Sequence, residues 1–225
     1  MNETKLTERG RRTRQRIIEA TGEQILASGI GGTTLDTVRA ATLTSKSQLF
    51  HYFPGGKTEL VREVAVWEGR QLFAAQEPEI HDLGSWGSWE RWRAGLVEYY
   101  IGRGRWACPI GSLATQAAAV DAELDRTVAE GMRAWRSALA AGVLRMRTVG
   151  LVAESADPGR ISVSILAAIQ GGLVLSQPER SAWPLEAALD SALSPLRSAE
   201  VAATPAEENV APAPPPETTP CQKRR

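Results

Sequence analysis

Apolar residues recur at helical spacing along nearly the whole chain, and the alternation typical of strands is scarce. Residues with high helix propensity, chiefly Ala, Leu, Glu, Arg and Gln, dominate the sequence. Near the start, Ile18, Thr21 and Ile25 lie on one helical face, and Gly29 is a suitable C-terminal stop. These positions predict a first helix over residues 8–28 and an all-α fold.

Two short helices separated by a tight turn are predicted next. After a glycine pair, Thr33 or Thr34 is a suitable N-cap for a helix over residues 35–41. A turn through Leu43 leads to a helix over residues 45–52, which the sequence Pro-Gly-Gly ends. This arrangement is a helix-turn-helix, whose second helix enters the major groove of DNA.

The rest of the chain is predicted to be helical up to a change in composition at Val201. The expected helices cover residues 57–75, 88–103, 112–120, 122–148, 158–177 and 184–200. From Val201 onward the chain holds six prolines and few apolar residues, which predicts a disordered tail. The expected divisions are a helix-turn-helix domain at 8–56, a larger helical domain at 57–200 and the tail at 201–225.

The position of charge matters more than its total, because 26 basic and 26 acidic residues give a net charge of zero. Residues 1–16 carry six basic residues against two acidic ones. The basic residues are Lys5, Arg9, Arg11, Arg12, Arg14 and Arg16. Such an arm suits contact with phosphates, and a solvated helix start is the alternative interpretation.

The second helix of the pair has the two faces that DNA recognition needs. Val38, Leu49 and Phe53 would form the inner apolar contacts. Lysine binds guanine acceptors or phosphates, and glutamine pairs with adenine. Free amides at the start of the following helix could also hold a phosphate. The candidate DNA-binding residues are Thr34, Thr44, Ser45, Lys46, Gln48, His51, Tyr52 and Lys57. The alternatives are a purely structural cap for Ser45 and a solvated surface position for Lys46.

Several of these residues together form a family pattern. They are Ile17–Ala20, Gly29, Thr34, Leu35, Val38, Ser45–Pro54 and Lys57. The segment from Arg16 to Leu60 that contains them resembles the DNA-binding domain of TetR-family transcriptional regulators. The motifs FHYFPGGK and ACPIGSLA, the latter at residues 107–114, resemble the LmrA/YxaF-like branch.

Three residues depart from the family pattern. Leu43 occupies the position of the usual turn glycine, so the turn is expected to be tight or strained. Phe50 replaces a common tyrosine and lacks the hydroxyl that could bond to a phosphate. Gly22 replaces a larger apolar residue, which predicts a close approach of another helix there.

The resemblance implies that residues 57–200 form dimers and bind a small effector. The apolar stripes on the last two predicted helices either mediate this dimer or pack inside one subunit. Aromatic residues crowd the middle of the chain, where they could surround a planar ligand or form ordinary core. The candidate ligand-binding residues are Trp67, Trp92, Tyr99, Trp106, Trp135 and Gln170.

Other function classes lack support in the sequence. There are two histidines and no HExxH, CxxC, nucleophile elbow or phosphate-binding glycine loop, so we expect no catalytic residues, metal or cofactor. No apolar run approaches the roughly 20 residues that cross a bilayer. Cys108 and Cys221 are far apart, which favours a reduced, cytoplasmic protein. Cys108 is either a redox switch or a plain buried thiol.

These observations lead to one main hypothesis. The chain is expected to be a homodimeric repressor that leaves a palindromic DNA operator when a small apolar or aromatic effector shifts the helix over residues 57–75. The alternative is a helical interaction protein that keeps the helix-turn-helix only as a scaffold.

Overall fold

The computed structural model describes residues 6–198, which form helices joined by short connections and no β-strand. The first group of helices comprises α1 (Glu8–Gly32), α2 (Leu35–Thr42) and α3 (Lys46–Tyr52), followed by α4 (Gly56–Ala74). The second comprises α5 (Trp86–Val97), α6 (Pro109–Ala114), α7 (Ala117–Val120), α8 (Ala122–Thr148), α9 (Pro158–Glu179) and α10 (Trp183–Ser198). The expected all-α class is confirmed.

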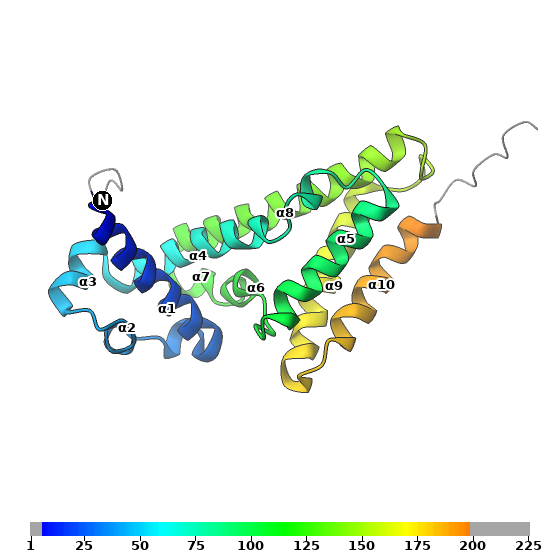
Figure 1. Cartoon of the computed structure of the whole chain (residues 1–225). Helices are drawn as coiled ribbons and strands as arrows, with labels where there is room; N and C mark the ends of the chain where they lie inside the picture. Colours follow the sequence, from blue (N-terminus) through cyan, green and yellow to red (C-terminus); the bar gives the residue numbers. More distant parts are fainter. Residues whose placement is uncertain (1–5, 199–225) are drawn as a thin grey trace, which may run out of the picture.

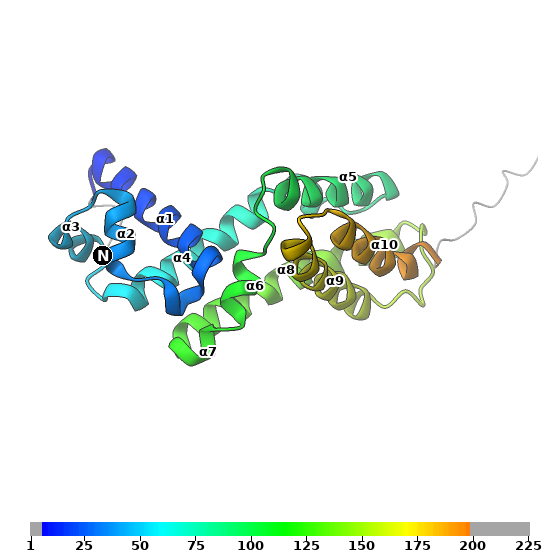
Figure 2. The same ribbon diagram turned by 90° about the horizontal axis from the view of Figure 1, so that it is seen from below.

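The molecule is elongated, with α1, α2 and α3 at one end and α5, α9 and α10 at the other (Figure 1). Helices α4 and α8 pack against each other and connect the two ends. Helix α6 contacts α1, α4 and α8, so it lies where the two groups meet (Figure 2). A conformational change at one end can therefore reach the other end through α4, α6 and α8.

The regular part of helix α1 ends at Gly29, as the sequence predicts. Gly29 has φ 70° and ψ 174°, which interrupts the helix before a last turn to Gly32. Glycine adopts this backbone conformation without the steric cost that a side chain brings. The close approach predicted at Gly22 is also present, because a Cβ atom there would lie 3.0 Å from Glu68 Oε1 and 3.6 Å from Val64 Cγ1 of α4.

The later helices differ from their predicted bounds at two places. The predicted helix over 88–103 is α5 followed by a π-helical turn, Glu98–Gly102, and a short 3-10 helix, Glu79–His81, precedes α5. The predicted helix over 112–120 is divided into α6 and α7, and α6 begins earlier because Cys108 caps it and Pro109 fits its first turn. The predicted helix end at residue 200, the tail at 201–225 and Lys5 lie outside the described residues.

The apolar stripes of α9 and α10 pack mainly against the chain's own core. Ile165 and Ile169 of α9 and Leu189 of α10 are fully buried. At Gly172 a Cβ atom would lie 2.7 Å from the Cα of Leu185, so the missing side chain serves packing within the subunit. Of the two alternatives for the stripes, packing inside one subunit accounts for their buried large residues, whereas Leu175 of the same stripe is exposed.

A different set of residues on α9 and α10 is exposed. The large apolar members are Val163, Val174, Leu175 and Trp183. Ala167 and Gly171 lie between them on α9 and are also exposed. Small residues at such positions allow another helix to approach closely.

Helix α9 is also the one helix within residues 6–198 that is long and apolar enough to cross a membrane by length and composition. The sequence expectation that no apolar run reaches this length was therefore wrong. The helix packs along α8 and α10, and its outer face is apolar as well. A core helix with an apolar outer face explains the composition.

Candidate functional site

Helix α3 begins with a reciprocal cap between Ser45 and Gln48. Ser45 Oγ accepts a hydrogen bond from the Gln48 amide at 3.2 Å, and Gln48 Oε1 accepts one from the Ser45 amide at 3.0 Å. This capping box satisfies two backbone donors that a helix start leaves without intrahelical partners. The candidate adenine-binding side chain therefore also stabilises the helix that presents it.

The outer face of α3 is polar and exposed. Lys46, Gln48 and His51 all point away from the core and remain exposed. The predicted inner residues are buried with no exposed surface: Val38, Leu49 and Phe53. The structure thus leaves three of the candidate DNA-binding side chains exposed on one short helix.

The turn between α2 and α3 has the strain expected from the absence of glycine. Leu43 adopts a left-handed conformation, φ 51° and ψ 38°, and its side chain is 92% exposed. Thr44 follows and is buried, and its hydroxyl donates to the Thr42 carbonyl at 3.3 Å. Contrary to expectation, Thr44 does not share the exposed surface of α3, because the turn points its side chain inward.

The other candidate contacts lie at helix ends around this surface. Thr34 is exposed and caps α2, with its hydroxyl accepting from the Thr37 amide at 3.1 Å. The rings of His51 and Tyr52 meet edge to face, with centroids 5.1 Å apart. Tyr52 and Lys57 are half-buried, Lys57 in the first turn of α4. His51 and Tyr52 belong to the last turn of α3, and Lys57 follows it at the start of α4.

One of the backbone amides at the start of α4 is occupied by a carboxylate. The Gly55 amide donates to Glu59 Oε2 at 2.6 Å. A carboxylate thus occupies the position of an anion at this helix start, and its negative charge disfavours a second one. Phosphate contact at this point would need the Glu59 side chain to move away.

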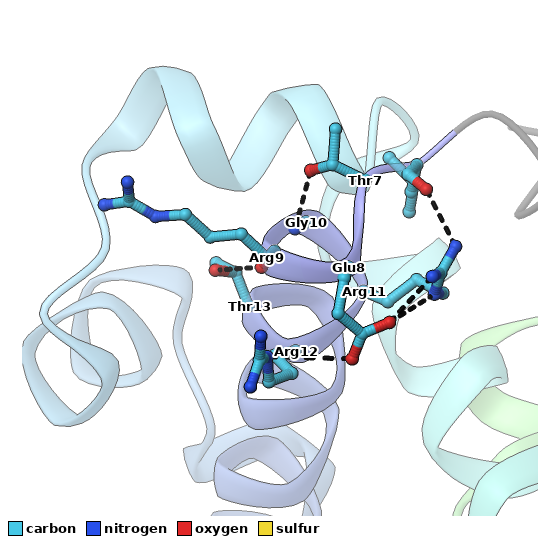
Figure 3. Close-up of polar contacts among 8 residues, drawn as sticks. Thr7, Glu8, Arg9, Gly10, Arg11, Arg12 and Thr13 are labelled. Carbon is cyan, nitrogen blue, oxygen red and sulfur yellow. Dashed lines mark hydrogen bonds and ion pairs between the residues drawn. The ribbon is translucent and has the colours of Figure 1, made fainter.

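The basic arm at the start of α1 is partly neutralised by nearby acids (Figure 3). Glu8 accepts from Arg11 at 2.7 Å and lies 3.7 Å from Arg12. Arg14 forms an ion pair with Glu63 of α4 at 2.6 Å. Arg9 extends away from Glu8 and is exposed. The Glu8 pairs are exposed and therefore weak, so a phosphate can compete for Arg11 and Arg12, whereas the Arg14 side chain is only 12% exposed.

Gln116, between α6 and α7, holds the interrupted end of α1. Its Oε1 accepts from the Ile30 amide at 2.8 Å, and its Nε2 donates to the Ser112 carbonyl at 3.0 Å. The amide of Ile30 is free for this bond because Gly29 breaks the helix just before it. One side chain therefore connects α6 with α1, and no sequence signal indicated this role.

A second connection joins α4 to the start of α8. Arg62 donates to both carboxylate oxygens of Asp121, at 2.7 and 2.8 Å, and also pairs with Glu123. The hydrogen bonds from Arg62 and from the Leu124 amide lower the pKa of Asp121 to about 2. Asp121 is also the N-cap of α8, so one carboxylate fixes both the helix start and α4.

A third, more buried connection lies on the side of α4 that faces α1. Glu68 is 1% exposed, and Arg105 donates to its Oε1 at 3.1 Å. Burial raises the pKa of the Glu68 carboxyl, while the charge of Arg105 opposes that rise. Arg105 also donates to the hydroxyl of Tyr99. This cluster attaches α4 to the segment that leads into α6.

A cavity of about 370 Å³ lies between α6, α8 and α9. Its volume is in the range of small-molecule sites. Its principal lining residues are Cys108, Gly111, Ser112, Thr115, Met132, Gln170, Leu173, Val174 and Gln177. Four of these residues belong to α6 or its caps, namely Cys108, Gly111, Ser112 and Thr115. They lie within or next to the ACPIGSLA motif, so this motif was the sequence signal that could have located the cavity.

Most of the predicted ligand-binding aromatic residues do not line this cavity. Trp92 and Trp135 are buried and both donate to Gln76 Oε1, at 2.8 and 2.9 Å. Tyr99 bonds to Arg105, and Trp67 is half-buried near Gly22. Trp106 is half-buried with the Arg180 guanidinium over its ring. Of the predicted set, only Gln170 lines the cavity. The prediction failed for the aromatic residues because aromatic content alone does not distinguish core residues from ligand-binding residues.

Comparison with known proteins identifies relatives for both parts of the chain. Residues 90–191 match the family described as transcriptional regulator LmrA/YxaF-like, C-terminal domain. A protein of Lactococcus lactis subsp. lactis, named an uncharacterized HTH-type transcriptional regulator in the lacX 3′ region, is 24% identical over 187 residues. That match covers 80% of this chain and 91% of the relative.

Solved structures of similar shape share the fold at low identity. A TetR-family transcriptional regulator from Cytophaga hutchinsonii has a TM-score of 0.76 at 17% identity, covering 88% of this chain and all of that chain (100%). The regulatory protein TetR from Rhodobacter sphaeroides has a TM-score of 0.72 at 16% identity, covering 79% and 95%. The resemblance expected from the N-terminal motifs is confirmed, and it extends along the chain.

Proposed function

We propose that this chain is a transcriptional regulator of the TetR family with an LmrA/YxaF-like C-terminal region. We further propose that it is a homodimeric repressor, which a small apolar or aromatic effector releases from a palindromic operator. We take residues 8–56 as the DNA-binding domain and residues 57–200 as the effector-binding and dimerisation domain. The proposal has three parts, which are operator recognition, dimer formation and release.

Operator recognition is the part with the most direct support. The observation that carries it is the exposure of Lys46, Gln48 and His51 on one short helix that follows a tight turn. Lysine and glutamine supply the donors and acceptors that read base edges in the major groove. Arg9 and Arg16, exposed on α1, supply charge for the phosphates.

Dimer formation is supported by the exposed face of α9 and α10. Val163, Val174 and Leu175 expose apolar surface there, and Gly171 leaves room for a facing helix. We propose that pairing two copies through this face presents two α3 helices to one DNA duplex. A palindromic operator with half-sites about 34 Å apart would then fit them.

Release is supported by the contacts between the cavity and the DNA-binding domain. Ser112 and Thr115 line the cavity, and Gln116 follows them directly and binds the Ile30 amide of α1. A ligand that displaces α6 would therefore move or break this bond. The Arg62–Asp121 contact would transmit movement of α8 to α4. The ligand must bind the two arrangements with different affinity, since otherwise no population shifts.

In vitro selection of bound DNA duplexes tests the proposal. We expect a palindromic consensus bound with a steep loss of affinity as salt concentration rises, because phosphate contacts release counterions. Weak binding without sequence preference would contradict operator recognition. A consensus with a single half-site would contradict the proposed dimer while leaving recognition intact.

A further inference from the structure

The turn that leads into α3 presents one apolar side chain to solvent. Leu43 adopts a left-handed conformation, φ 51° and ψ 38°, and its side chain is 92% exposed. Leucine is unfavourable here in two respects, since its Cβ atom strains this backbone conformation and its side chain gains free energy by leaving water. Strained residues that the surrounding structure holds in place are concentrated at functional sites.

Both neighbours of Leu43 are buried, and they fix the direction of its side chain. Thr42 Oγ1 donates to the Val38 carbonyl at 2.8 Å. The Thr44 amide donates to the Arg39 carbonyl at 3.1 Å. The Leu43 side chain therefore projects from a backbone that is held on both sides. Because the turn is already ordered, a contact made by this side chain needs little further ordering of the chain.

Two other residues within 6–198 that are not glycine also have a positive φ, and these two contact each other. Trp106 has φ 54° and Arg180 has φ 50°, and the Arg180 guanidinium lies 5.8 Å from the centre of the Trp106 ring. Leu43 is almost fully exposed, so packing within the described chain does little to offset its strain. Its side chain is therefore suited to a contact outside the chain.

Leu43 lies at the end of α3 that would face the bases. In a helix-turn-helix, the N-terminal residues of the second helix contact base edges in the major groove. Leu43 precedes the N-cap Ser45 by two positions and the exposed Lys46 by three. A leucine side chain neither donates nor accepts a hydrogen bond. The apolar group that base edges present in the major groove is the 5-methyl group of thymine.

We infer that Leu43 contacts the 5-methyl group of one thymine in each operator half-site and gives the protein a preference for thymine at that position. The inference rests on the proposed function, because it adds a specificity-determining residue to operator recognition. The family pattern has a glycine here, and glycine has no side chain to make this contact. The preference therefore distinguishes this chain from relatives that follow the pattern.

A base analogue that removes only the methyl group tests the inference on the full-length protein. The probe is the operator obtained by selection, in which each thymine of a half-site is replaced in turn by deoxyuridine, in both half-sites together. Uracil keeps the hydrogen-bonding groups of thymine and lacks its 5-methyl group. We expect one of these replacements to weaken binding about fourfold per half-site at constant salt, because one methyl-sized apolar contact is lost.

Two substitutions at Leu43 and one control assign the effect to this side chain. Leu43→Gly should bring the affinity ratio of the thymine operator to the uracil operator close to one. Leu43→Ala keeps the Cβ atom and should give an intermediate ratio. Leu144→Ala, the same change at an exposed leucine of α8, should leave the ratio unchanged. Leu43→Gly should still bind the uracil operator specifically, which would show that α3 is intact in this variant.

Three results would overturn the assignment while leaving the proposed function in place. They are a consensus without any A·T pair, equal affinities for thymine and uracil at every position of the half-site, and a methyl preference that survives Leu43→Gly unchanged. In each case the unmodified protein still binds its selected operator specifically. Absence of specific operator binding by the unmodified protein would refute the proposed function, and the inference with it.

Discussion

The helix-turn-helix unit and the cavity differ in how far apart along the chain their essential residues lie. The capping box of α3 joins residues three positions apart, and the exposed Lys46 lies between them. The cavity combines residues from Cys108 to Gln177 on three helices, and its link to α1 through Gln116 spans 86 positions. Local chemistry builds the first site, and tertiary packing builds the second.

This difference implies that the two regions respond differently to substitution. On α3 a side chain can change while its helix persists, because caps and three buried inner residues hold the helix. In the larger helical region, Trp92 and Trp135 are buried away from the cavity and share the Gln76 amide oxygen, so a change there affects folding before it affects binding. The following substitutions test this contrast, beginning with the largest expected effect.

Trp135→Ala should lower the free energy of unfolding by about 3–5 kcal/mol, measured in urea at fixed protein concentration. Trp135 is 1% exposed, and its loss also removes one of the two donors to Gln76. Trp135→Phe keeps a ring and should cost less. A small loss of stability together with a selective loss of effector response would instead indicate that Trp135 contacts the effector.

Lys46→Ala should weaken operator binding by about 1–3 kcal/mol and relax base preference in each half-site, measured by titration at constant salt. The fold should be unaffected, since Lys46 is exposed. Arg136→Ala, an exposed charge removed from α8, is the control and should leave affinity unchanged. Equal effects of both variants would mean that α3 has no special role.

Gly172→Ala should destabilise the protein by about 1–3 kcal/mol, because the new Cβ would lie 2.7 Å from the backbone of Leu185 and α10 must shift. Gly131→Ala in helix α8, away from the proposed dimer face, is the matched control, because no atom lies within 4 Å of the new Cβ. It should raise stability by up to about 1 kcal/mol through helix propensity. Thermal unfolding of both variants checks the pair, and similar shifts would contradict the close approach of α9 and α10.

Leu43→Gly should raise stability by up to about 1 kcal/mol, since glycine adopts the left-handed conformation of this turn without strain. The gain is limited by the greater freedom of glycine in the unfolded chain. Leu43→Ala keeps a Cβ atom and loses only exposed surface, so it should change little. A larger gain in stability from alanine than from glycine would show that the exposed Leu43 side chain, and not backbone strain, is what destabilises this position.

Features of the fold that depend on short-range chemistry could be predicted from the sequence. Gly29 as a helix stop, Thr34 and Ser45 as caps, and Val38 and Leu49 as inner residues follow from local spacing, and the structure confirms them. The expected strain at Leu43 is present as well. Thr44 was misassigned because its burial depends on the geometry of the turn, which residue type does not specify.

The cavity could not be predicted in the same way. Trp92 and Trp135 resemble ligand-binding aromatics by composition, yet Gln76 satisfies both indole N–H groups inside the core. The lining of the cavity depends on how α6, α8 and α9 cross. The ACPIGSLA motif marks part of this lining, but the residue types of Gly111 and Ser112 alone do not indicate a cavity. Gln170 is the predicted ligand-binding residue that does line the cavity.

The shared use of Gln48 has an evolutionary consequence under the proposed mode of operator reading. Any mutation that retargets this position toward another base also removes a cap, unless the replacement still accepts from the Ser45 amide. Glutamate does so, since it is the other residue of the capping box, and it pairs with cytosine where glutamine pairs with adenine. Descendants of this protein can therefore exchange adenine for cytosine at one step of the half-site without weakening α3, whereas other changes of target require compensation elsewhere.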